Sequence, residues 1–137
     1  LLQWITATSE RQPPLRAMKS LRRVRIYGRK STTLFLAEVQ VWAKGLNVAR
    51  AAVAYATPGT ITATECGGIA DVARVIDGVT ECGFCEVPGA AVRVGTGDYV
   101  ELTLPSDVTA DRIVVFNRCD CCASRMGGTH MDLTTAV

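Results

Sequence analysis

Apolar residues recur at every second position in three stretches of the chain, the period of a β-strand that buries one face and exposes the other. The stretches are "RRVRIYG" (22–28), "FLAEVQVWA" (35–43) and "YVELTLP" (99–105). Their apolar positions are Val24 and Ile26 in the first, Leu36, Val39 and Val41 in the second, and Val100, Leu102 and Leu104 in the third. This pattern predicts antiparallel strands with one face exposed to solvent.

A fourth stretch, "DRIVVFN", carries a denser β-branched and aromatic run from Ile113 to Phe116, which is typical of a strand at the centre of a sheet. Gly, Pro, Asn and Asp clusters separate the runs at short intervals and predict turns. The segment "GGIADVARVID" could form a helix of about two turns, with Ile69, Val72 and Ile76 on one face. We therefore expect an all-β fold, an antiparallel β-sandwich with at most a short helical element.

The composition fits one soluble globular domain. The chain has 137 residues, of which 48% are hydrophobic and 20% charged. It contains no apolar run near the roughly 18 residues that a membrane span needs, so we expect no membrane insertion. The first residues lack both a methionine and the order of a signal peptide, and we expect a processed piece of a longer chain.

Basic residues are concentrated near the start, although the net charge is only +2. Residues 1–30 hold eight of them against Glu10 alone: Arg11, Arg16, Lys19, Arg22, Arg23, Arg25, Arg29 and Lys30. We assign 1–20 to a basic arm or linker and 21–137 to the domain. No aromatic residue is interleaved with the arginines of "LRRVRI", which alternates as a half-buried strand does, so we expect a solvated strand face and no nucleic-acid binding.

Six cysteines in a small domain indicate either an oxidising compartment or a metal site. Cys82 and Cys85 form a C-x-x-C, but the cluster that begins at Cys119 lies farther along the chain than the about 15–20 residues typical of a zinc ribbon. We therefore expect disulfides, no zinc, and an extracellular or cell-surface location. No βαβ pattern surrounds the C-x-x-C, which argues against a redox role.

Catalytic patterns are weak, and we expect no enzyme. The single histidine, His130, stands in "GGTHMDL" without a Ser/His/Asp or Cys/His partner order. Asp77, Glu81 and Glu86 could be imagined as a glycosidase pair, but turns are commonly acidic and nothing fixes their separation.

Four segments in order resemble the F-type lectins, the fucose-binding relatives of the discoidin or coagulation-factor C domains. They are "LNVARAAVAYAT", "ADVARVIDG", "YVELTLP" and "IVVFNRCDCCASRMGG", within roughly 46–133, and the last is the specific one. The resemblance implies a jelly-roll β-sandwich that binds carbohydrate outside the cell.

The same resemblance implies the sugar-binding residues. Arg118, Asp120 and Arg125 fit the family's arginine, aspartate and second basic position, and a disulfide between Cys121 and Cys122 would offer a flat sulfur surface to an apolar sugar face. The other four cysteines, Cys66, Cys82, Cys85 and Cys119, remain for two bridges of open pairing. The family's third ligand, a histidine, falls near Arg93, and this extra arginine favours an acidic glycan over neutral fucose.

The resemblance also implies a calcium site. The family's calcium loop corresponds to Arg74–Val79, with Asp77 as a carboxylate ligand and Arg74 and Val79 as ligands through their backbone carbonyls. Glu38 of "LAEVQV" would be the distal carboxylate. Carbonyl and carboxylate oxygens are the hard ligands that Ca²⁺ prefers.

The order of the segments departs from the family. Residues 21–44 resemble its C-terminal strand pair but precede 46–137, which resemble its main body. Either the domain is circularly permuted and closes on its own N-terminal strands, or the chain is cut from tandem repeats. We expect a carbohydrate-binding module with a fucosylated or acidic glycan as ligand; the alternative is a structural module that packs against other chains or repeats of a surface or virion assembly.

Overall fold

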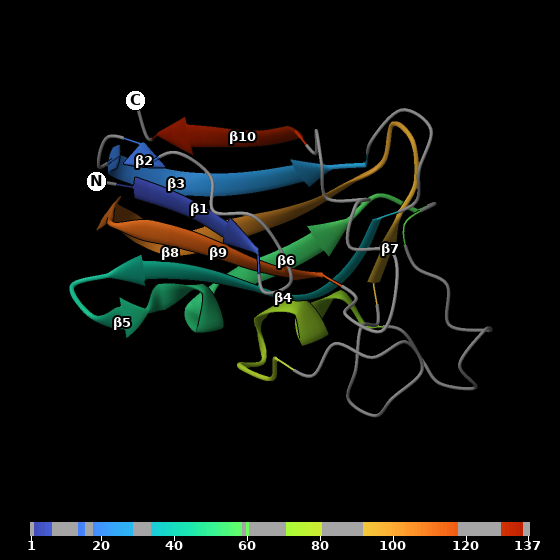
Figure 1. Ribbon diagram of the computed structural model, residues 1–137, viewed down its shortest axis with the longest axis horizontal. Helices are drawn as coiled ribbons and strands as arrows, with labels where there is room; N and C mark the ends of the chain where they lie inside the picture. Colours follow the sequence, from blue (N-terminus) through green and yellow to red (C-terminus); the bar gives the residue numbers. More distant parts are fainter. Residues whose placement is uncertain are drawn as a thin grey trace.

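The computed structural model describes residues 2–6, 14–15, 18–28, 34–58, 60, 71–80, 92–117 and 130–135. These residues form two β-sheets (Figure 1). The all-β fold class is thereby confirmed. The described residues contain no α-helix, and none of their helical turns is long and apolar enough to cross a membrane.

The larger sheet has six strands. Five follow the order β2-β1-β9-β4-β5, and β7 pairs with β4 as well. Its members are β1 (Leu2–Thr6), β2 (Pro14–Leu15), β4 (Leu34–Ala43), β5 (Leu46–Asn47), β7 (Val92–Val94) and β9 (Arg112–Asn117). The pairing of β1 with β9 is parallel, and the others are antiparallel. The central place of β9 confirms the expectation from its dense apolar run.

The smaller sheet has the order β10-β3-β8-β6, and all its pairs are antiparallel. It consists of β3 (Met18–Tyr27), β6 (Val53–Ala56), β8 (Tyr99–Ala110) and β10 (His130–Thr135). Two 3₁₀-helices accompany the sheets: η1 (Val48–Ala51) and η2 (Val72–Ile76). The helical element expected within 67–77 is therefore a short one, as predicted.

The early part of the chain contributes to both sheets. Residues 1–20, assigned from sequence to an arm or linker, contain β1, which pairs with β9, and the first residues of β3. Most of β3 and all of β4 lie within 21–44, and each of these strands pairs with strands that come after residue 91: β3 with β8 and β10, and β4 with β7 and β9. Strands β3 and β4 thus join the later strands in the same sheets.

The core lies between the sheets and contains the apolar positions that the period of two singled out. Its fully buried members include Val24 and Ile26 of β3, Leu36, Val39 and Val41 of β4, Leu102 and Leu104 of β8, and Ile113 and Val115 of β9. The opposite face of the smaller sheet is partly exposed, and there Arg25 binds Glu101, with 2.6 Å between Nη2 and Oε2. Arg22 lies 3.6 Å from Asp107 in the same sheet. Two arginines of the basic stretch therefore have carboxylate partners on a strand face.

A β-bulge explains why Leu36 and Val39 both reach the core although they are three residues apart. Leu36 pairs with Asn117 and Glu38 with Phe116, so one residue of β4, Ala37, is inserted between consecutive pairs. Beyond the bulge, Val39 and Val41 face the core. Glu38 and the alternate positions after it therefore lie on the opposite face of the sheet.

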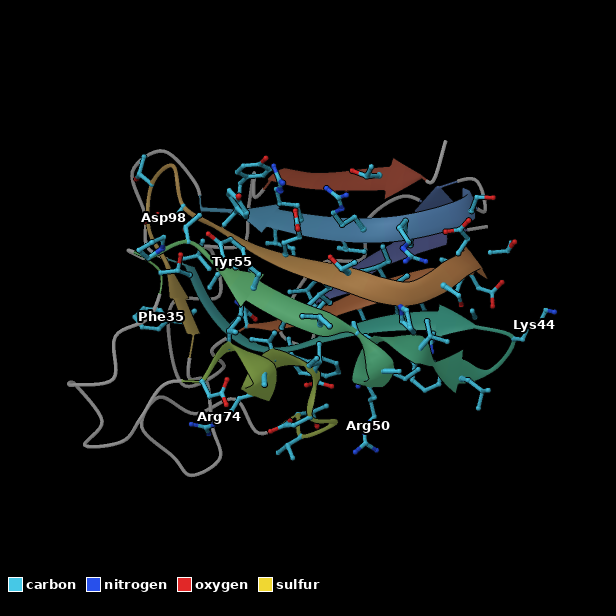
Figure 2. All side chains as sticks on the ribbon, turned by 180° about the vertical axis from the view of Figure 1, so that it is seen from behind. Phe35, Lys44, Arg50, Tyr55, Arg74 and Asp98 are labelled. Atoms are coloured by element: carbon cyan, nitrogen blue, oxygen red, sulfur yellow. The ribbon has the colours of Figure 1, made fainter. Side chains whose placement is uncertain are left out.

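Close backbone contact joins the end of β3 to the turn before β8. The amide of Gly28 donates to the carbonyl oxygen of Asp98 at 3.0 Å, and a Cβ atom on Gly28 would lie 1.9 Å from the carbonyl oxygen of Gly95. Thr57, after β6, donates from its hydroxyl to Asp98 Oδ1 at 2.8 Å. Three segments thus meet at this end of the molecule, where Figure 2 labels Asp98.

We predict that Gly28→Ala lowers the free energy of unfolding by about 3 kcal/mol or more, because the added methyl group meets backbone that cannot move aside. Gly97→Ala is the matched control: Gly97 has φ +80° but open space around its Cβ position, so only a backbone cost of about 1 kcal/mol is expected. Urea unfolding of both variants measures the difference. Equal losses would contradict the close approach at Gly28.

Candidate cation site

Glu38 is a charged residue placed at the β4 bulge and fully buried. Its Oε1 atom accepts a hydrogen bond from the amide of Gly78 at 3.0 Å. Its Oε2 atom is buried and accepts no hydrogen bond from the residues that the structure describes. A buried carboxylate oxygen without a donor is costly, and it points to a cation or a proton as its partner.

The loop that contacts Glu38 follows η2, and η2 is held in place by its own residues. At the start of η2, the Asp71 carboxylate accepts a hydrogen bond from the amide of Ala73 at 2.9 Å and caps the helix. Val75 and Ile76, at its end, are buried in the core. The loop after η2 therefore starts from a fixed position beside β4.

Asp77 and Gly78 form the turn itself. Asp77 Oδ1 accepts a hydrogen bond from the amide of Val79 at 2.8 Å, and Gly78 adopts φ +86°, a conformation that favours glycine. This turn aims the Gly78 amide at Glu38. The structure thus brings together the two carboxylates predicted for the metal, Glu38 and Asp77, from segments 39 positions apart in the sequence.

Burial is the largest influence on the pKa of Glu38. Burial, and after it the negative charge of Asp77, raise the pKa of Glu38 from its ordinary value of 4.5 to about 8. The hydrogen bond from Gly78, the positive charge of Arg50 and the side chain of Gln40 act in the opposite direction. When both carboxyl groups are ionised, they form a local excess of negative charge, which a divalent cation would neutralise.

The donor set fits calcium better than a transition metal. Glu38 and Asp77 supply carboxylate oxygens, and the peptide carbonyls of Arg74 and Val79, in the same loop, remain the predicted further ligands. Within the described ranges, no three His, Cys, Asp or Glu side chains gather into a group that could hold a metal. A cation here would therefore depend on backbone carbonyls and water as well as on the two carboxylates.

The predicted sugar-binding loop lies outside the described residues: Arg118, Asp120, Cys121, Cys122 and Arg125. All six cysteines lie outside them too, so the predicted disulfides stay predictions. Arg93 belongs to β7, where its backbone pairs with Phe35 of β4. On the other side of β4, Leu36 pairs with Asn117, the last residue of β9. Arg93 on one side of β4 and Asn117, at the end of β9, on the other side therefore pair with neighbouring residues of β4.

Sequence reasoning missed two residues beside Glu38. Gln40 follows it by two positions on the same strand face, and its Oε1 accepts a hydrogen bond from Trp42 Nε1 at 3.0 Å. The spacing 38–40–42 is a signal that could have been noticed. Arg50, in η1, carries no such signal, because only the fold brings η1 next to the Asp77–Gly78 turn.

Comparisons with known proteins leave the family open. No protein-family model, no curated protein and no solved structure matches the chain.

We predict that the protein without divalent cations loses stability as the pH rises from about 5 to 8. The folded state holds the Glu38 proton up to a pKa of about 8 and the unfolded state only to about 4.5, so unfolding releases a proton in this window. The free energy of unfolding should fall by up to about 1.4 kcal/mol per pH unit from this group.

Glu38→Gln keeps an oxygen for the Gly78 amide and removes the titration. Urea unfolding in a chelator at several pH values should show a smaller pH slope for the variant than for the unaltered protein. The same slope in both proteins would mean that Glu38 does not keep its proton in the folded state.

Proposed function

We propose that the protein is a non-catalytic carbohydrate-binding module of the F-type lectin or discoidin kind. It would be a jelly-roll β-sandwich in which a calcium site joins β4 to the loop after η2. The observation that carries the proposal is the hydrogen bond between the Gly78 amide and the buried Glu38 carboxylate. The resemblance pairs these two segments as one calcium site. Their contact in the fold supports it, because periodicity and composition give no reason for them to meet.

Calcium would act as a structural clamp in this proposal. It would neutralise Glu38 and Asp77 and connect β4 with the loop after η2, two parts of the fold that the described residues join by one hydrogen bond at this place. Extracellular modules bind calcium with dissociation constants of about 10⁻⁴–10⁻³ M. A site of two carboxylates completed by carbonyls suits that range and an extracellular or cell-surface location.

The sugar would bind near the end of β9 in this proposal. Arg118 and Arg125 would donate to the sugar, Asp120 would orient an arginine, and the Cys121–Cys122 disulfide would contact an apolar sugar face. The backbone position of Arg93, level with the end of β9 across β4, supports its inclusion. A third guanidinium in this region favours a fucosylated glycan that also carries an acidic group, or another acidic glycan.

We predict that millimolar calcium raises the melting temperature of the protein at pH 7.5, because it binds the folded state and not the unfolded one. Asp77→Asn should abolish most of this increase. Asp107→Asn, at an exposed aspartate on the other sheet, is the matched control and should leave it unchanged. An increase that survives Asp77→Asn would place the cation elsewhere.

We predict binding to fucosylated or acidic glycans on a glycan array, with a loss of about tenfold or more in affinity for Arg118→Ala, because hydrogen bonds to charged groups contribute about 1.5–3 kcal/mol each. Arg23→Ala, at an exposed arginine of β3, is the control and should bind as the unaltered protein does. No binding to any glycan by folded, oxidised protein would contradict the lectin proposal and favour the structural module that packs against other chains or repeats.

A further inference from the structure

Arg50 lies against the Asp77–Gly78 turn. Its Nε and Cζ atoms are 3.1 and 3.2 Å from the position that a Cβ atom would take on Gly78. A side chain at position 78 would therefore push the guanidinium away, so glycine serves the contact as well as the backbone conformation. Figure 2 shows Arg50 beyond the sheets, on the same edge of the molecule as Arg74.

The position of Arg50 has an electrostatic consequence. Its positive charge is close enough to lower the pKa of the Glu38 carboxyl, although it is the fourth influence after burial, Asp77 and the Gly78 amide. Arg50 is exposed, and it forms no ion pair within 4.0 Å with any carboxylate of the described residues. Its guanidinium thus lies against the turn that contacts Glu38, without an ion pair to a described carboxylate.

We propose that Arg50 is an internal counter-ion of the Glu38–Asp77 site, which competes with the divalent cation and sets its affinity. In the absence of the cation, the guanidinium compensates part of the negative charge of the two carboxylates. When a cation binds, the two positive charges repel each other, and the exposed side chain of Arg50 turns to solvent. This inference deepens the proposed calcium site and rests on it.

Two features of the site favour competition over a purely structural role. The fully buried Oε2 atom of Glu38 has no donor among the described residues, so Arg50 leaves the best cation ligand free. Arg50 also sits in the last turn of η1, a four-residue 3₁₀-helix, and its side chain is exposed. A long exposed side chain at such a place can move at little cost.

Calcium titration by calorimetry at pH 8 tests the inference. Arg50→Gln should bind calcium about tenfold more tightly than the unaltered protein, the effect of removing one like charge from a partly exposed site. Arg50→Lys keeps the charge and should bind nearly as the unaltered protein does. Arg112→Gln is the matched control, since Arg112 stacks on Trp42 at 5.0 Å and does not contribute to the Glu38 pKa.

A second measurement separates competition from a folding defect. In a chelator at pH 8, Arg50→Gln should melt at a lower temperature than the unaltered protein, because the carboxylates lose their counter-ion. At saturating calcium the difference should vanish or reverse. A loss of stability that is the same with and without calcium would mean a structural role and overturn the inference.

The outcomes also distinguish this inference from the proposed function. If the unaltered protein binds calcium and Arg50→Gln binds equally or more weakly, Arg50 is no competitor, and the calcium site stands. If neither the unaltered protein nor any variant binds calcium, the calcium site itself fails and the inference with it. If only Arg50→Gln binds calcium, Arg50 takes the place of the cation completely in the unaltered protein, which would support the inference.

Discussion

The buried carboxylate of Glu38 is the constraint on which the arrangement of this end of the fold depends. A carboxylate without solvent must be protonated, hydrogen-bonded or matched by a cation. Only one of its oxygens has a donor among the described residues, the amide of Gly78, and burial shifts its pKa to about 8. Near neutral pH the carboxyl group therefore keeps its proton unless a cation takes the place of that proton.

Glu38 owes its position to the strand that carries it. The bulge in β4 lets Leu36, Val39 and Val41 all enter the core and turns Glu38 to the opposite face. There the Asp77–Gly78 turn covers it, because η2 is fixed by its own buried residues. The two sheets, the bulge and the short helix thus act together to bring distant carboxylates to one place, and no single element would do so.

The strands could be predicted from sequence because each buries one face, so the period of two appears directly in the residues. The dense run at Ile113–Phe116 likewise located the central strand. The pairing of β1 with β9 could not be predicted, because it depends on contacts between segments far apart in the chain. The contact between Glu38 and the Asp77 loop was expected through the family resemblance alone. Arg50 was missed because its role depends on spatial neighbours that no local pattern records.

A crystal structure of the protein with terbium, a luminescent substitute for calcium, tests the central claim most directly. Anomalous scattering would locate the metal without reference to any assumed site. We expect a single strong peak bound by Glu38 Oε2, an oxygen of Asp77 and carbonyl oxygens of the loop 74–79. A structure without a peak there, with Glu38 hydrogen-bonded only to protein or water, would contradict the claim that this carboxylate is kept buried to hold a cation.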